Sequence, residues 1–198
     1  MYPNILELSR RFPLALASGS PRRQQLLREI GCQFSIETHD IDETRRPGEP
    51  ASDFARRLAE EKALAVRVSG AAMALGFDTV VVLSDTVLGK PTDADDAFRM
   101  LSMLSGQKHI VCTAVAFAQS GQILASDYDV TSVYFRPVSP EQLRHYVAAG
   151  EPMDKAGAYG IQGMGGFLVD RIEGNLDTVI GLPRGLMDRM AAGLLRKE

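Results

Sequence analysis

The pattern of apolar and polar positions predicts helices that alternate with strands in the first part of the chain. The apolar run Leu14–Ala17 predicts a short buried strand, and a helix from about Pro21 to Ile30 is expected directly after it. Gly31 is the expected C-cap of that helix. A short strand is predicted at 33–37, and the polar stretch 38–50 indicates a loop.

The middle of the chain predicts a helix, a buried strand and another helix. Apolar residues at helical spacing indicate a helix over 51–68 that ends at Ser69-Gly70. The valine-rich segment 74–83 predicts a central buried strand, which we expect to be interrupted at Asp78-Thr79. A helix with acidic residues in its first turn is predicted at 93–104.

The remaining pattern completes a mixed α/β arrangement. Two long strands are predicted at 109–118 and 123–135, and Ser120-Gly121 between them indicates an antiparallel hairpin. Helices interleaved with strands, together with one hairpin, predict a mixed sheet with flanking helices. The last predicted elements are a helix at 140–148 with Ser139 as its N-cap, a strand at 167–172 and a helix at 183–195.

Length and composition limit the class of protein. A chain of 198 residues can build one substantial core, so we expect a single domain over 1–198 and leave open a division into two lobes around a central cleft. A hydrophobic content of 45% and a charged content of 24% are typical of a soluble globular protein. The net charge of −3 argues against a general nucleic-acid-binding surface.

Targeting segments and metal motifs are not evident in the sequence. No apolar run approaches the roughly 20 residues of a membrane helix, and the N-terminal segment does not resemble a signal peptide, so we expect a cytoplasmic protein without a membrane partner. Cys32 and Cys112 lack metal-ligand spacing and are expected to be small buried residues. The three histidines, His39, His109 and His145, are too scattered for a zinc site.

The turn after the first predicted strand has the features of an anion site. Ser20 is a preferred N-cap residue and Pro21 suits the first helical position, so Ser18-Gly19-Ser20 presents free N–H groups, hydroxyls and the positive end of a helix dipole. With Arg23 nearby, this combination favours a phosphate ligand. The alternative is a capped turn with solvated arginines.

Asp78 is the strongest candidate for a reactive group. A carboxylate in an apolar strand is unfavourable unless it is paired, bound to metal or open to a cleft. It is therefore either a structural Asp at a strand end or a metal ligand or general base that acts on a phosphate ester. Glu43 lies in an acidic loop segment, where the alternative is simple solubility.

Two lysines and one glycine-rich segment add further candidates. Lys90 lies between Gly89, which allows a close backbone approach, and Pro91, which stiffens the chain, so its side chain could be held in one direction. Lys62 would by default belong to a solvated helix face. Five glycines within ten residues of the segment 151–166 exclude helix and strand interiors and indicate a loop that approaches a ligand, with a flexible linker as the alternative. The amide of Gln162 in this loop can read a uracil or thymine edge.

Several of these segments together resemble the Maf family of nucleoside triphosphate pyrophosphatases. The resemblance runs in family order from residue 14 to 183. It implies a Maf/ITPase-like fold with an elongated, twisted mixed sheet. Its motifs are Leu16-Ala17-Ser18-Gly19-Ser20-Pro21-Arg22-Arg23, Arg57-Leu58-Ala59 with Lys62-Ala63, Gly76-Phe77-Asp78-Thr79, Leu88-Gly89-Lys90-Pro91, Asp154-Lys155-Ala156-Gly157-Ala158-Tyr159-Gly160-Ile161-Gln162-Gly163 and Val179-Ile180-Gly181-Leu182-Pro183.

The resemblance also implies roles for individual residues. Asp78 matches the proton acceptor of the family. Substrate preference is implied for Arg23, Thr79 and Gln162, and other pocket positions for Ser18, Glu43, Lys62 and Lys90. Two positions depart from the family pattern: Phe77 replaces a small Ala, and 174–178 replaces a Gly-Ser-Tyr run.

The expected reaction is hydrolysis of a nucleoside triphosphate to a monophosphate and pyrophosphate. The glycine-rich segment resembles the branch that acts on dTTP and UTP, with a role in cleaning the nucleotide pool. A divalent cation, Mg²⁺ or Mn²⁺, is expected between the phosphates and the carboxylates of Asp78 and Glu43. The alternatives are a purine or non-canonical nucleotide pyrophosphatase and a nucleotide-binding regulator of septum formation. A homodimer is left open.

Overall fold

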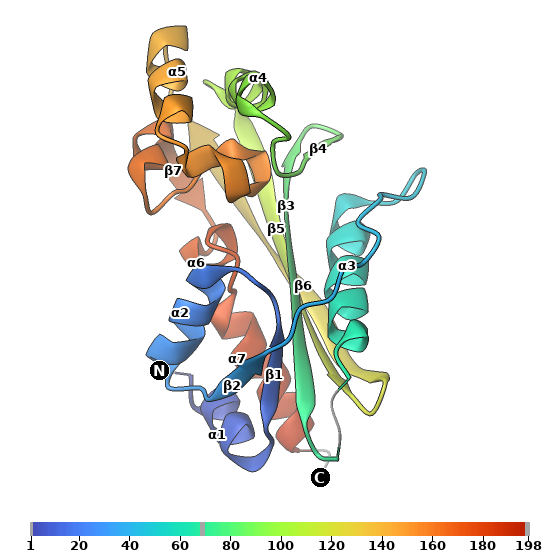
Figure 1. Cartoon of the computed structure of the whole chain (residues 1–198). Coiled ribbons are helices and arrows are strands. Elements are labelled where there is room, and N and C mark those ends of the chain that lie inside the picture. The colour runs from blue at the N-terminus through green and yellow to red at the C-terminus, as the bar shows by residue number, and fades with distance from the viewer. Residues whose placement is uncertain (1, 68–69, 197–198) are drawn as a thin grey trace. The chain divides into compact units, whose positions relative to one another are not determined.

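A computed structural model describes residues 2–67 and 70–196 and has a mixed α/β fold (Figure 1). The strand order is β2-β1-β3-β5-β6-β7, with β4 paired to β3. Strand β1 pairs in parallel with β2 and β3, whereas the pairs β3–β4 and β6–β7 are antiparallel. The predicted mixed sheet is therefore confirmed. The strands are β1 (Leu14–Ala17), β2 (Phe34–Ile36), β3 (Met73–Leu83), β4 (Thr86–Leu88), β5 (Lys108–Gln119), β6 (Gln122–Phe135) and β7 (Val169–Glu173).

Helix starts follow the capping residues in the sequence. The side chains of Ser20, Asp93 and Ser139 each accept a hydrogen bond from the backbone N–H three residues later, and Gly31 ends α2 in the left-handed conformation. The α-helices are α1 (Pro3–Arg11), α2 (Pro21–Ile30), α3 (Ala51–Ala65), α4 (Ala94–Leu104), α5 (Pro140–Ala148), α6 (Leu176–Val179) and α7 (Arg184–Leu195). Short 3₁₀ turns form η1 (Glu151–Asp154), η2 (Ala156–Ala158) and η3 (Met164–Leu168).

The chain divides into two compact units. The first is formed within residues 1–78, 113–129 and 181–198, and the second within 79–112 and 130–180. Strands β3, β5 and β6 each contribute residues to both units. The expectation of a single domain over 1–198 stays a prediction.

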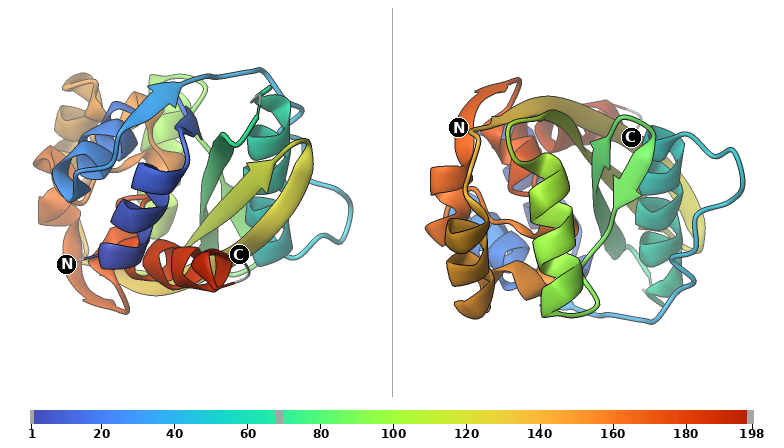
Figure 2. Two further views of the ribbon diagram at one scale, coloured as in Figure 1. Left: turned by 90° about the horizontal axis from the view of Figure 1, so that it is seen from below. Right: turned by 90° about the horizontal axis from the view of Figure 1, so that it is seen from above.

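The first unit packs helices on β1 and the first half of β3. All four residues of β1 are buried, as predicted for this apolar run. Helix α3 runs alongside β3 (Figure 1), and α1 lies against α7 (Figure 2, left). Apolar side chains such as Leu16, Leu58 and Leu75 fill the space between these elements.

The second unit has its own apolar core. Helix α4 lies beside α5 (Figure 2, right), and both contribute buried side chains to one cluster that includes Leu101, Leu104, Tyr146 and Leu168. The predicted hairpin between β5 and β6 turns at Ser120-Gly121, where both residues have positive φ. Among the described residues, no helix combines the length and apolar character needed to cross a membrane.

Three sequence-based assignments need correction. Strand β3 continues through Asp78-Thr79 without interruption. The strand predicted at 167–172 begins only at Val169, because 164–168 forms a 3₁₀ turn. The helix predicted over 51–68 ends at Ala65, and the stop expected at Ser69 lies outside the described residues. Helices α1 and α6 were not predicted.

Candidate functional site

Lys62 joins two carboxylates in the first unit. Its Nζ lies 2.6 Å from Oδ1 of Asp78 and 2.7 Å from Oε1 of Glu43. The side chains of Lys62 and Asp78 are only 19% and 10% exposed, whereas that of Glu43 is 56% exposed. The interpretation of Lys62 as part of a solvated helix face is therefore wrong. The cluster has one buried end at Asp78 and one open end at Glu43.

Close packing of α3 on β3 brings Lys62 to Asp78. A Cβ atom on Gly76 would overlap the carbonyl oxygen of Ala59 and would lie 2.8 Å from the amide nitrogen of Ala63. Side chains alternate along a strand, so Gly76 and Asp78 face the same side, toward α3. Only glycine allows this approach, and the approach places an ammonium group over the buried carboxylate.

The environment of Asp78 favours proton uptake. Burial raises the pKa of Asp78 above its usual value, while the charges of Lys62 and Arg23 oppose this effect. Asp78 lies inside β3 and not at a strand end, and its carboxylate is paired with Lys62. The carboxylate of such a pair can accept a proton, and its ammonium group can contact a phosphate.

The serine turn holds Arg23 at the start of α2. Ser18 Oγ accepts a hydrogen bond of 2.7 Å from Arg23 Nη1, and the Nε of Arg23 donates to the carbonyl of Gly181 at 2.9 Å. The hydroxyl of Ser20 is occupied as the N-cap. The guanidinium of Arg23 also lies 5.2 Å from the ring centroid of Phe77. The arginine is thus fixed by the turn and is not a freely solvated side chain.

Electrostatics leave Arg23 as a cation. Burial lowers its pKa to about 10, and the nearby charge of Asp78 acts in the opposite direction. Arg23 therefore remains protonated at neutral pH. Phe77, the departure from the family pattern, packs under this cation on the face of β3 opposite to Asp78. Thr79 also points to that opposite face, away from the Lys62 side of the strand.

An ion pair that was not expected from the sequence anchors the loop before α3. Arg57 donates to both oxygens of Glu49, at 2.7 and 2.9 Å, and also to the carbonyl of Thr44. The two side chains are only 13% and 10% exposed. The same loop carries Glu43, so Arg57 fixes the chain that brings this carboxylate to Lys62. The long polar stretch 38–50 was the available sequence signal for this ion pair, because a long loop needs contacts that hold it in place.

Lys90 and Gln162 belong to the second unit. Both residues are exposed. Their segments are joined by a backbone hydrogen bond of 2.9 Å from Gly157 N to Gly89 O. The glycine-rich segment is ordered into short turns with Tyr159 buried, so the flexible-linker interpretation is wrong. The structure thus groups Ser18, Ser20, Arg23, Glu43, Lys62 and Asp78 in one unit and Lys90 and Gln162 in the other.

The donor set of the first unit is compatible with a divalent cation that also contacts a ligand. Among the described residues, no group of three or more His, Cys, Asp and Glu side chains is arranged to hold a metal. Asp78 and Glu43 nevertheless converge on one ammonium group. Mg²⁺ is commonly held by one or two carboxylates together with substrate phosphates, and these two side chains meet that requirement.

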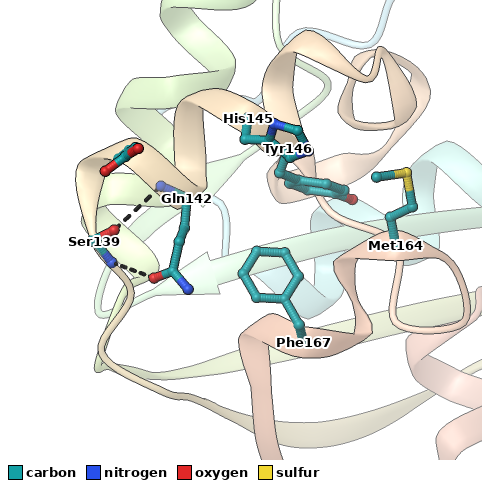
Figure 3. A pocket seen from close by; sticks show the side chains of 7 residues that line it. Ser139, Gln142, His145, Tyr146, Met164 and Phe167 are labelled. Carbon is teal, nitrogen blue, oxygen red and sulfur yellow. Dashed lines mark hydrogen bonds between the residues drawn. The ribbon is translucent and has the colours of Figure 1, made fainter.

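A separate groove of about 680 Å³ lies in the second unit (Figure 3). It is lined by Ser139, Glu141, Gln142, His145, Tyr146, Met164 and Phe167. None of the predicted site residues is among these lining residues. The groove therefore contains none of the predicted site residues, and the candidate site is defined by the charged cluster of the first unit.

These features define a class of α/β proteins that handle phosphate compounds. A capped turn with a half-buried arginine and a lysine between two carboxylates can supply anion contacts, a proton acceptor and oxygen ligands for a cation. The chain belongs to the family of Maf-like proteins, which it matches over residues 13–194.

Several named relatives are similar over most of the chain. A dTTP/UTP pyrophosphatase of Escherichia coli O157:H7 is 51% identical over 172 residues, covering 86% of this chain and 87% of that protein. Proteins with the same name are 47% identical in Hahella chejuensis, over 86% of each chain, and 47% identical in Syntrophomonas wolfei, over 92% of this chain and 100% of that protein. A solved structure of a HAM1 protein from Coxiella burnetii aligns over 94% of this chain and 100% of its own, with a TM-score of 0.47 and 16% identity.

Proposed function

We propose that this protein is a pyrophosphatase that hydrolyses dTTP and UTP to the monophosphate and pyrophosphate. The relatives named dTTP/UTP pyrophosphatase support the substrate class, at 47–51% identity over most of the chain. The observation that carries the reaction is the buried Asp78 with Lys62 Nζ 2.6 Å away. In this role the enzyme cleans the cytoplasmic nucleotide pool. A homodimer stays a prediction.

The reaction is a displacement at the α-phosphorus. Asp78 accepts a proton from the attacking water, whose oxygen forms the new bond to phosphorus. The bond from the α-phosphorus to the bridging oxygen breaks, and that oxygen leaves with pyrophosphate. Arg23 and Lys62 stabilise the negative charge that moves toward the leaving group. Lys90 is retained as a candidate substrate contact from the family resemblance.

The serine turn binds phosphate oxygens. Ser18 fixes the guanidinium of Arg23, and the turn offers backbone N–H groups at the start of α2. A preorganised arginine gains more from a phosphate contact than a mobile one, because its side-chain freedom is already lost. Ser20 contributes to this phosphate site as the N-cap of α2, which defines where that helix begins.

A divalent cation, Mg²⁺ or Mn²⁺, would be held by Asp78 and Glu43 together with phosphate oxygens. When bound, it supplies charge neutralisation at the phosphates. Lys62 keeps the two carboxylates close to one another, since both lie within 2.7 Å of its Nζ.

Base selection is assigned to Gln162. Its amide offers both a donor and an acceptor, which match the O4 acceptor and N3–H donor of thymine and uracil. Gln162 is exposed and therefore available to a ligand. Thr79 is retained as a second candidate for substrate preference.

A nucleotide panel tests the proposal. Pyrophosphate release is measured with dTTP, UTP, CTP, GTP, dITP and XTP, each with and without Mg²⁺. We expect release from dTTP and UTP in the presence of the metal. Preference for dITP or XTP would contradict the pyrimidine assignment. Nucleotide binding without pyrophosphate release would contradict the enzymatic function and favour a regulator.

A further inference from the structure

The half-buried Glu151 and the buried Tyr146 together form an anchor for the glycine-rich loop. Tyr146 OH donates to Oε1 of Glu151 at 2.8 Å and accepts from the backbone N–H of Gly160 at 3.1 Å. The Glu151 carboxylate also accepts from the N–H groups of Met164 at 2.8 Å and Gly165 at 3.1 Å. Figure 3 shows Tyr146 directed from α5 toward the segment that carries Met164.

The anchored backbone positions flank Gln162 on both sides. Gly160 precedes it by two residues, and Met164 and Gly165 follow it by two and three. Within residues 2–67 and 70–196, no hydrogen bond of the Gln162 side chain is found. The place of its amide is therefore set by the backbone on either side, and that backbone is held by Glu151 and Tyr146.

The glycines of this loop fit around the same two side chains. A Cβ atom on Gly163 would lie 2.6 Å from Cδ of Glu151, and one on Gly165 would lie 2.5 Å from the hydroxyl of Tyr146. Neither glycine has a positive φ, so the requirement for glycine here is space and not backbone conformation. The glycine-rich pattern indicated a ligand loop, whereas Gly163 and Gly165 are required by their contacts with Glu151 and Tyr146.

The anchor is also electrostatically consistent. Burial raises the pKa of Glu151, but the hydrogen bonds from Gly165, Met164 and Tyr146 outweigh it and hold the pKa below its usual value. Glu151 is thus ionised at neutral pH and accepts from all three donors at once. An amide at this position could accept from two of them but would turn an N–H toward the third.

We propose that Glu151 and Tyr146 are positioning residues for base selection, which act by fixing the loop that presents Gln162. The inference rests on the proposed function, because Gln162 selects the base only if the protein acts on nucleotides. It concerns the discrimination among nucleotides and not the hydrolysis itself. A site that reads a base by hydrogen bonds loses selectivity when its polar groups move by about 1 Å. The chemistry assigned to Asp78 and Lys62 uses neither side chain.

The test compares Glu151→Gln and Tyr146→Phe with the unmodified enzyme. Both substitutions are nearly isosteric, and each removes part of the anchor. We expect the ratio of kcat/KM for dTTP to that for CTP to fall roughly tenfold, through a higher KM for dTTP with little change in kcat. The amide hydrogens of Met164 and Gly165 should exchange faster with solvent in Glu151→Gln.

A second tyrosine–glutamate pair provides a matched control. In the same unit, Tyr134 OH donates to Glu173 Oε2 at 2.8 Å, and this pair bonds to no glycine-rich loop. The substitutions Glu173→Gln and Tyr134→Phe remove the same chemical groups. They should leave the dTTP/CTP ratio unchanged.

A double-mutant cycle shows whether the anchor acts through Gln162. If Gln162→Ala already removes the selectivity, adding Glu151→Gln should reduce it no further. An unchanged dTTP/CTP ratio in Glu151→Gln and Tyr146→Phe would overturn the inference, as would equal losses on all nucleotides. The unmodified protein is assayed first. If it releases no pyrophosphate from any nucleotide, the proposed function itself fails, and this result is separate from any comparison of variants.

Discussion

Gly76 on β3 and Ala59 on α3 approach so closely that no side chain fits between them. A Cβ atom on Gly76 would overlap the carbonyl oxygen of Ala59, and would lie 2.8 Å from the amide nitrogen and 2.9 Å from the Cβ of Ala63. Two of these three atoms at risk of a clash belong to the helix backbone, which cannot move without moving the helix. The distance between α3 and β3 therefore depends on this one glycine. That distance also sets the contact between Lys62 and Asp78.

Gly76→Ala should damage both stability and activity. The added methyl group pushes α3 from β3, and overpacking of this kind destabilises a protein by about 1–3 kcal/mol. Because Lys62 moves with α3, pyrophosphate release should fall more than the loss of stability explains. Urea denaturation and the rate at saturating dTTP measure the two effects.

Gly193→Ala is the matched control for this substitution. Gly193 lies in α7, and a Cβ atom there meets no atom within 4 Å. Alanine in a helix interior should stabilise the protein by about 0.5–1 kcal/mol and leave the rate unchanged. Full activity of Gly76→Ala would contradict the link between this packing and the site.

The fold could be predicted wherever its signal is local. The caps at Ser20 and Ser139 and the hairpin turn at Ser120-Gly121 are short motifs, and each was confirmed. The interruption expected at Asp78-Thr79 was wrong because Lys62, sixteen residues earlier, offsets the cost of burying Asp78. A compensation that comes from another element has no trace in the local pattern.

Candidate site residues could be predicted by type but not by arrangement. Asp78 stood out as a charge in an apolar strand, whereas the pair of Arg57 and Glu49 did not, since ion pairs on helices and loops are common. The 3₁₀ turn before β7 was missed because its anchor, Glu151, lies thirteen residues before Met164. Long-range contacts decided each of these cases.

Asp78→Asn should remove most of the turnover. The amide keeps the shape and can still accept a hydrogen bond from Lys62, but it cannot take a proton from water. Loss of a general base lowers rates by about 10²–10⁴. Pyrophosphate release from dTTP measures the loss, and thermal unfolding shows that the fold is kept. Near-normal turnover in this variant would rule out Asp78 as the proton acceptor.

Glu43→Gln should weaken the use of the metal more than the fold. Glu43 is largely exposed, so its carboxylate adds little to stability but is one of the two proposed oxygen ligands. We expect the Mg²⁺ concentration for half-maximal rate to rise roughly tenfold, with a smaller change in the rate at saturating metal. Chelation of the metal should abolish turnover of the unmodified enzyme.

Asp40→Asn is the comparison for this effect. Asp40 is exposed in the same loop, so the substitution removes the same charge without a proposed ligand. Its metal dependence should equal that of the unmodified enzyme. Equal shifts in the two variants would indicate a general charge effect and contradict the ligand role of Glu43.

The pair of Glu49 and Arg57 should make stability depend on pH in the acid range. The hydrogen bonds from Arg57 lower the pKa of Glu49 from 4.5 to about 2, so the folded state favours the ionised form. The stabilisation is therefore fully present above pH 4.5 and is lost as the pH falls toward 2. Glu49→Gln lacks this titration, and the difference in urea stability between the two proteins should be largest near pH 7 and should shrink below pH 4.5. A difference that stays constant from pH 7 to pH 3 would show that the pair does not anchor the loop that carries Glu43.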